Sequence, residues 1–128
     1  MSPMTRVVAA VIEKKRKYLA CQRPGNKRHG GLWEFPGGKV RANETDTEAV
    51  RRELAEELNV HVIEVGATLY KAPDPGSDYL IVFKSVRIIG EPQPLEHDAL
   101  CWAAPLELMG FRLAPSDEMF VHRYLLRN

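Results

Sequence analysis

The stretch from residue 37 to residue 60 constrains the chain most, because it joins a pair of glycines to a segment rich in acidic residues. Thr45 and Glu48 form the Thr-x-x-Glu pattern of a capping box, which predicts that a helix begins beside them. Asn59 stands where that helix should end, and Asn is the usual second choice after Gly for a left-handed cap residue. The stretch therefore predicts a glycine loop that leads into a helix over residues 46–58.

The predicted helix carries a group of carboxylates on one face. Glu53, Glu56 and Glu57 stand at i, i+3 and i+4, and neither Glu53 nor Glu57 has a Lys or Arg at helical-neighbour spacing. A helix selected for stability alone would alternate its charges, as Glu48, Arg52 and Glu56 do. Oxygen-only ligands favour Mg²⁺ or Mn²⁺ over zinc. The pattern therefore indicates a divalent-cation site, and the alternative is a solvated acidic face.

The spacing of these residues resembles the Nudix box, which that family writes as G-x5-E-x7-R-E-U-x-E-E-x-G-U, with U an aliphatic residue. The matching positions are Gly38, Glu44, Arg52, Glu53, Leu54, Glu56, Glu57 and Val60. Asn59 replaces the last Gly of the motif, a difference that concerns a helix cap and not a ligand. Residues 31–39, Gly-Leu-Trp-Glu-Phe-Pro-Gly-Gly-Lys, also resemble the MutT-type branch of the family.

The resemblance implies an α/β fold, namely a Nudix-type α/β/α sandwich with a mixed, mostly antiparallel sheet, in one domain over residues 1–128. It also implies a hydrolase that converts a nucleoside triphosphate into a nucleoside monophosphate and pyrophosphate. The expected substrate is 8-oxo-dGTP, whose removal from the nucleotide pool serves DNA repair. Alternatives are a CTP or dCTP pyrophosphohydrolase, an enzyme for another diphosphate-linked nucleoside, a non-catalytic nucleotide-binding module and a structural Ca²⁺ protein.

The resemblance also implies roles for the residues of the motif. Glu53 takes the general-base or metal-binding role, Glu56 and Glu57 bind the metal, and Glu44 supports them. The backbone carbonyl of Gly37 can add a further ligand. The bound cation would be Mg²⁺, with Mn²⁺ as a possible substitute, and it would neutralise phosphate oxygens and lower the pKa of water.

Two further residues are assigned to the catalytic machinery. Arg52 lies four residues from both Glu48 and Glu56, so we expect it to orient the carboxylate cluster. Glu96, next to His97, resembles the acidic loop residue that many relatives add to the site. The alternative for Glu96 is an ordinary surface glutamate.

The predicted substrate contacts lie before, within and after the glycine stretch. Arg23 ends a predicted strand and is positioned to meet phosphate. Phe35 precedes the Pro-Gly-Gly turn, where a base can stack on its ring, although such residues more often belong to the core. Gly38 and Lys39 complete the predicted contacts in the glycine loop.

Asp117 is the predicted base-reading residue. The segment Ala-Pro-Ser-Asp that ends at Asp117 resembles the place where MutT-type enzymes carry this residue. An ionised carboxylate only accepts hydrogen bonds, which favours the adjacent N1 and N2 donors of an oxidised guanine over cytosine. Cytosine would require a proton shared with the carboxylate, yet a Pro-x-Asp segment also resembles relatives that act on cytidine triphosphates. A helix-stabilising acid in a first turn is the alternative role.

The composition narrows the choice of partners. The chain has 128 residues and a net charge of +1, so no bulk charge favours a nucleic-acid polymer or a membrane surface. Cys21 and Cys101 are too few for a disulfide framework and favour a reducing, cytoplasmic location. The apolar run over residues 7–12 is too short to span a membrane. We expect a small-molecule nucleotide as the partner and either a monomer or a homodimer.

Hydrophobic patterning predicts the remaining elements. A hairpin is expected with its charged turn over residues 13–16, and Ser116 is expected to cap the final helix. The predicted strands cover residues 6–12, 17–22, 32–35, 60–70, 79–89 and 100–103, followed by a helical turn over 105–109 and a helix over 117–126.

Overall fold

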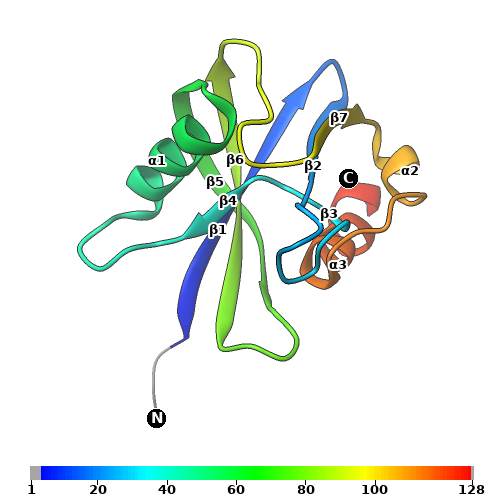
Figure 1. The fold of residues 1–128 in the computed structure, drawn as a ribbon, viewed down its shortest axis with the longest axis horizontal. Coiled ribbons are helices and arrows are strands. Elements are labelled where there is room, and N and C mark those ends of the chain that lie inside the picture. Colours follow the sequence, from blue (N-terminus) through cyan, green and yellow to red (C-terminus); the bar gives the residue numbers. More distant parts are fainter. Residues whose placement is uncertain (1–3, 128) are drawn as a thin grey trace.

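In the computed structural model, which describes residues 4–127, strand β1 (Thr5–Lys14) runs through the middle of the sheet with helices on both sides (Figure 1). Its side chains alternate between two cores, as the geometry of a strand requires. Val8 and Ile12 pack in the core beneath helix α1 (Asp46–Leu58), whereas Ala9 and Val11 pack in the core beneath helix α3 (Pro115–Arg123). A continuous apolar run therefore forms a strand that is buried on both faces.

The sheet is mixed and mostly antiparallel, and helices cover both of its faces, as predicted. Its main order is β3-β2-β1-β6-β5, while β4 pairs with β1 and β7 pairs with β2. Among the pairings of named strands within residues 4–127, β1–β6 alone is parallel, with Thr5 opposite Tyr79. The bounds are β2 (Lys17–Gln22), β3 (Trp33–Glu34), β4 (Gly37–Lys39), β5 (His61–Pro73), β6 (Tyr79–Ile89), β7 (Ala99–Ala103), α2 (Pro105–Leu108), α3 (Pro115–Arg123) and the 3₁₀ turn η1 (Leu125–Arg127).

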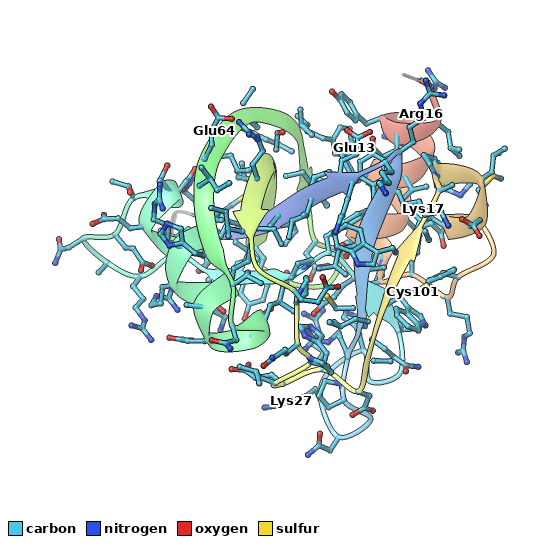
Figure 2. All side chains as sticks on the ribbon, turned by 90° about the horizontal axis from the view of Figure 1, so that it is seen from above. Glu13, Arg16, Lys17, Lys27, Glu64 and Cys101 are labelled. Carbon is cyan, nitrogen blue, oxygen red and sulfur yellow. The ribbon has the colours of Figure 1, made fainter. Side chains whose placement is uncertain are left out.

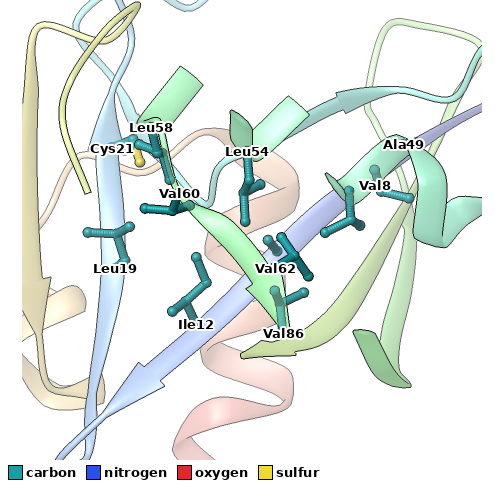
Figure 3. Packing of buried hydrophobic residues seen from close by; sticks show 12 residues of the cluster. Val8, Ile12, Leu19, Cys21, Ala49, Leu54, Leu58, Val60, Val62 and Val86 are labelled. Atoms are coloured by element: carbon teal, nitrogen blue, oxygen red, sulfur yellow. The ribbon is translucent and has the colours of Figure 1, made fainter. Parts of the chain in front are cut away.

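Helix α1 is held by its caps and by one apolar stripe. Thr45 and Glu48 form the predicted capping box, in which each side chain accepts a hydrogen bond from the other residue's backbone N–H, at 3.1 and 2.9 Å. Leu54 and Leu58 are fully buried against the strands of the sheet (Figure 3). Burying each leucine contributes about 1.5–3 kcal/mol. The acidic face of the helix is thus fixed relative to the sheet.

Aromatic rings fill the second core, beneath α3. Phe83 and Phe120 stack with their centroids 4.3 Å apart, and Phe35 meets both rings edge to face. Tyr124 stacks on the other side of Phe120 at 5.4 Å. Such pairs contribute about 0.5–1.5 kcal/mol each beyond the burial of their area. This core holds the start of α3 close to Phe35 and the glycine stretch.

The β1–β2 hairpin turn is tighter than predicted. Lys15 and Arg16 alone form the turn, both with positive φ, because β1 continues through Lys14 and β2 begins at Lys17. Figure 2 shows Arg16 and Lys17 at this tip, with Glu13 beside them. Charge next to the turn does not prevent strand pairing when the side chains reach solvent.

The final helix begins earlier than predicted and ends sooner. Ala114 is the N-cap and Pro115 the first helical residue, since proline suits a position where no N–H is needed. The prediction that Ser116 caps this helix is wrong. Its hydroxyl instead donates to the Asp74 carboxylate at 3.2 Å. The helix stops at Arg123 and is followed by the separate turn η1.

Two strands also differ from prediction. The glycine stretch forms the short strand β4, paired with β1, where a loop was expected. Strand β5 extends to Pro73 and contains register shifts along its pairing with β6. Within residues 4–127, no helix is long and apolar enough to cross a membrane.

Asn59 adopts the predicted left-handed conformation, with φ 55° and ψ 43°, so its substitution tests the cap. We expect Asn59→Gly to leave the free energy of unfolding nearly unchanged, and Asn59→Val to lower it by about 1 kcal/mol or more. Denaturant unfolding measures both. Asn26→Val, in an exposed loop, is the matched control, and equal losses at both positions would contradict the assignment.

Candidate active site

Arg52 connects the loop before α1 to the acidic face of the helix. Its guanidinium holds both carboxylate oxygens of Glu44, at 2.7 and 2.9 Å. The same group donates to Glu53 at 2.7 Å and to the backbone carbonyl of Lys39 at 3.0 Å. Bidentate arginine–carboxylate pairs fix geometry as well as charge. Arg52 therefore positions Glu53 and the end of β4 together.

These contacts correct two sequence predictions. Glu53 does have a cationic neighbour, because the side chain of the adjacent Arg52 turns back along the helix surface to reach it. Arg52 does not orient Glu48, whose carboxylate accepts from the N-cap backbone instead. Glu56 lies at 3.8 Å from Arg52, the spacing that the sequence predicted.

The Arg52 contacts also fix the charge of Glu44. Its hydrogen bonds with Arg52, and then the backbone N–H of Arg41, lower the pKa of Glu44 to about 2. The acidic partners in turn raise the pKa of Arg52, Glu44 most strongly. Glu44 is accordingly ionised throughout the neutral range and supports the site as a fixed anion.

Glu57 is buried in the seam between α1 and β4, with 6% of its surface exposed. Its Oε1 accepts a hydrogen bond from the backbone N–H of Gly37 at 3.3 Å. Burial, a hydrogen bond with Glu53 and the charges of Glu53 and Glu34 raise the pKa of Glu57 far above that of a free glutamate. In the absence of a cation, Glu57 is therefore protonated at neutral pH and bonded to Glu53.

The glycine pair makes room for this arrangement. A Cβ at Gly38 would overlap the carboxylate of Glu53, and a Cβ at Gly37 would overlap the backbone carbonyl of Val8. Gly37 also has a φ of 155°, which side chains rarely adopt. Gly37 and Gly38 therefore let β4 fit between β1 and the carboxylates of α1.

The donor set fits a divalent cation. Within residues 4–127 no group of three or more acidic, His or Cys side chains already converges as a metal site. However, burial and the neighbouring Glu53 raise the pKa of Glu57, and a cation at this position can replace the proton that burial favours. Glu56 is about half exposed and free to turn toward them. The carbonyl of Gly37 stays a predicted ligand, since the contact seen is made by its N–H.

A cavity of about 340 Å³ adjoins the carboxylates, a size typical of ligand pockets. The structure brings all the predicted substrate residues to its wall. The lining includes Arg23, Phe35, Gly38, Lys39 and Asp117, and also Glu34. Gly38 is the link to the acidic face, since it lines the cavity and touches Glu53.

Phe35 and Lys39 occupy the cavity wall in different ways. Phe35 is 3% exposed and packs against Phe83 and Phe120, so its ring is a core element and not an open stacking platform for a base. Lys39 is exposed, and its amine lies 5.0 Å above the ring of Tyr79. A hydrogen bond with the Tyr79 hydroxyl raises the pKa of Lys39. Lys39 is therefore a cation at the cavity mouth.

Asp117 lies on the buried side of the cavity. Its Oδ1 accepts a hydrogen bond from the backbone N–H of Phe35 at 2.9 Å. Burial, followed by the charge of Glu34, raises the pKa of Asp117 well above its usual range. The sequence analysis expected an ionised Asp117, whereas burial in the folded chain favours the neutral acid.

Glu34 is a cavity residue that the sequence analysis did not single out. Its carboxylate accepts from Arg23 at 3.0 Å and lies 3.0 Å from His97. The sequence did hold a signal for Glu34. Side chains alternate between the two faces of a strand, so in the short predicted strand the acid next to Trp33 had to face away from the aromatic core. Arg23 is thus held at the cavity by a partner eleven residues further along the chain.

Glu96 does not join the cluster in this structure. Its side chain is exposed, and it makes no hydrogen bond or ion pair with any residue in the range 4–127. The backbone next to Glu96 is bound to α1 instead, since the N–H of Leu95 donates to the backbone carbonyl of Glu57 at 3.1 Å. The catalytic role of Glu96 stays a prediction.

The protonation of Glu57 has a consequence for stability. As pH rises above about 4.5, the unfolded chain releases this proton while the folded chain keeps it, so the free energy of unfolding falls. In Glu57→Gln the glutamine side chain is neutral at every pH, so this variant lacks the pH-dependent fall in the free energy of unfolding. In the presence of a chelator, we expect the melting temperature of Glu57→Gln to exceed that of the parent by more at pH 8 than at pH 5. Thermal unfolding across this range measures the difference, and parallel pH profiles would contradict the buried, protonated state.

Comparison with known proteins agrees with this geometry. The model of the NUDIX domain family matches residues 2–125. The chain is 40% identical over 116 residues to an Escherichia coli protein named CTP pyrophosphohydrolase, covering 89% of this chain and 86% of that protein. It is 34% identical over 126 residues to an 8-oxo-dGTP diphosphatase of Haemophilus influenzae, covering 94% and 90%.

A solved structure shows the same fold. The crystal structure of a MutT NUDIX hydrolase from Burkholderia pseudomallei superposes with a TM-score of 0.82 at 25% identity, covering 95% of this chain and 98% of that one. The family match, the full-length relatives and the shared fold lead to one conclusion: the chain belongs to the Nudix hydrolases, as a MutT-like member of the nucleotide pyrophosphohydrolase type.

Proposed function

We propose that this protein hydrolyses a nucleoside triphosphate to a nucleoside monophosphate and pyrophosphate. The observation that carries the proposal is the position of Gly38, which lines the cavity on one side and touches Glu53 on the other. A nucleotide in the cavity would thus extend its phosphates toward the carboxylates of α1. Arg23 and Lys39 supply cations along that path.

A divalent cation, for which we propose Mg²⁺ with Mn²⁺ as a substitute, would neutralise phosphate oxygens and make a water molecule more acidic. Glu53, Glu56 and Glu57 are the residues that would hold it. Arg52 keeps the Glu53 carboxylate oriented, and we assign Glu53 as the group that accepts the proton of the attacking water. Glu44 remains a fixed anion that anchors Arg52.

For the base, we propose a cytidine nucleotide as the first candidate. A neutral carboxyl group presents one donor and one acceptor side by side. Cytosine presents the complementary pair, an N3 acceptor beside the N4 amino donor. Burial of Asp117 therefore supplies the proton that an ionised carboxylate would lack. This proposal also agrees with the name of the Escherichia coli relative.

The oxidised nucleotide 8-oxo-dGTP is the second candidate. Its oxidised base carries a proton on N7 beside the O6 acceptor, so it too offers a donor and an acceptor to a neutral acid. Unmodified guanine presents two acceptors at this edge. The candidate agrees with the name of the Haemophilus influenzae relative. Either substrate fits a cytoplasmic location, as do the free Cys21 and Cys101.

A nucleotide panel tests the reaction. We expect pyrophosphate release with Mg²⁺ from CTP, dCTP or 8-oxo-dGTP in preference to dGTP. Glu57→Gln should fold normally and lose most turnover, because it removes a metal ligand while preserving the shape of the side chain. Parental turnover by Glu57→Gln at saturating Mg²⁺ would remove Glu57 from the metal site. No pyrophosphate from any nucleotide in the parent would refute the proposed reaction.

Asp117 can be tested separately from the metal site. Asp117→Asn retains a donor and an acceptor at every pH, so we expect it to keep the base preference of the parent. Asp117→Ala should lower discrimination between bases by about ten- to a hundredfold, since it leaves site groups unpaired. The KM of the parent should rise with pH as the acid ionises, and that of Asp117→Asn should not. If Asp117→Asn loses discrimination as fully as Asp117→Ala does, the neutral-acid assignment fails.

A further inference from the structure

His97 lies against the cavity residue Glu34 but has no role in the proposed reaction. Its Nε2 is 3.0 Å from Oε2 of Glu34, and its side chain is 5% exposed. The carboxylate of Glu34 can only accept, so Nε2 carries the hydrogen in this contact. The other ring nitrogen, Nδ1, is buried and has no hydrogen-bond partner within the described part of the chain.

A buried ring with one unpaired nitrogen is a poor choice for stability alone. A polar atom that loses water without gaining a partner destabilises the folded state, and an apolar side chain would avoid the loss. Such an exception to hydrogen-bond pairing is expected where a site requires a particular donor. The donor needed here is the Nε2–H that meets Glu34.

The fold holds His97 in a fixed position. Strand β2 pairs with β3 on one side and β7 on the other, so Glu34 and the residues just before β7 approach each other across β2. The N–H of Asp98 donates to the carbonyl of Gln22 at 3.0 Å, directly beside His97. The N–H of Leu95 donates to Glu57 of α1. The β6–β7 connection thus runs from the α1 side of the molecule to β7 (Figure 1) and is fastened at both ends.

Glu34 in turn holds Arg23. Oε1 of Glu34 accepts from Nη1 of Arg23 at 3.0 Å, while Oε2 faces His97. The Arg23 Nε donates to the carbonyl of Arg28 at 2.6 Å, which leaves Nη2 as the group available to a ligand. The guanidinium therefore enters the cavity in one orientation, provided that the Glu34 carboxylate does not rotate.

We propose that His97 is a positioning residue for substrate binding: its Nε2–H fixes Oε2 of Glu34, so that Oε1 holds Arg23 ready for the nucleotide. The proposal rests on the proposed function, because Arg23 matters only if a nucleotide enters the cavity. His97 is not among the residues that line the cavity, and its side chain meets Glu34 and not the carboxylates of α1. Its loss should weaken binding more than it slows the chemical step.

A set of variants tests the proposal once the parent hydrolyses a nucleotide. We expect His97→Leu to raise KM by about ten- to a hundredfold and to change kcat less than threefold. His97→Gln should recover most of this loss, because its side-chain amide also donates. His61→Leu, an exposed histidine on β5, is the matched control and should leave KM unchanged.

A double-mutant cycle separates positioning from a general structural effect. If His97 acts through Glu34, His97→Leu combined with Glu34→Gln should match the KM of Glu34→Gln alone within twofold. If the KM increases of the two single variants multiply in the double variant, the proposal is overturned. An unchanged KM in His97→Leu would overturn it as well. The ¹⁵N spectrum of the parent provides a test without variants: Nε2 should carry the proton. A ring protonated only on Nδ1 would also overturn the proposal. Failure of the parent to hydrolyse any nucleotide would instead count against the proposed function.

Discussion

The carboxyl group of Glu57 lies out of reach of solvent between α1 and β4, and the arrangement around it follows from that burial. An isolated carboxylate in such a place is costly, so the group keeps its proton and bonds to Glu53. Arg52 then compensates the charge of Glu53 and Glu44, and it ties β4 to the helix through the carbonyl of Lys39. Only glycine at position 38 leaves space for this contact. The acidic face is therefore preorganised by hydrogen bonds before any cation enters.

The acidic side chains in and beside the cavity are of two kinds, buried ones and a paired one. Glu57 and Asp117 are buried, which raises the pKa of both, whereas Glu34 is paired with Arg23 and lies beside His97. The charge of Glu34 contributes to the raised pKa of both Glu57 and Asp117. After burial, Glu34 thus adds to the raised pKa of Glu57, a proposed metal ligand, and of Asp117, the proposed base-reading residue. The phosphate side and the base side of the cavity are electrostatically connected through Glu34.

Local sequence signals predicted the parts of the molecule that local interactions determine. The capping box at Thr45, the left-handed Asn59 and the stripe of α1 were all readable, because each depends on residues within one or two helical turns. Spacing predicted that Glu48 serves the cap, but it could not reveal that Arg52 holds Glu44, because Glu48 and Glu56 were the partners at helical spacing from Arg52. The contacts of Glu34 with His97 and of Asp117 with Phe35 join distant segments. The burial of Asp117, which raises the pKa of its carboxyl group, was not predicted because burial is a property of the whole fold.

The parallel pairing of β1 with β6 also bears on how the chain reaches its folded state. β1 is apolar on both faces, yet the strand that completes its pairing lies far along the chain, with Thr5 opposite Tyr79. Contacts between distant segments form slowly, because a long loop must close before they are made. During synthesis, the N-terminal hairpin must therefore leave the ribosome with an unpaired, hydrophobic edge. This interval, and not the finished structure, is the stage at which the chain is most open to aggregation.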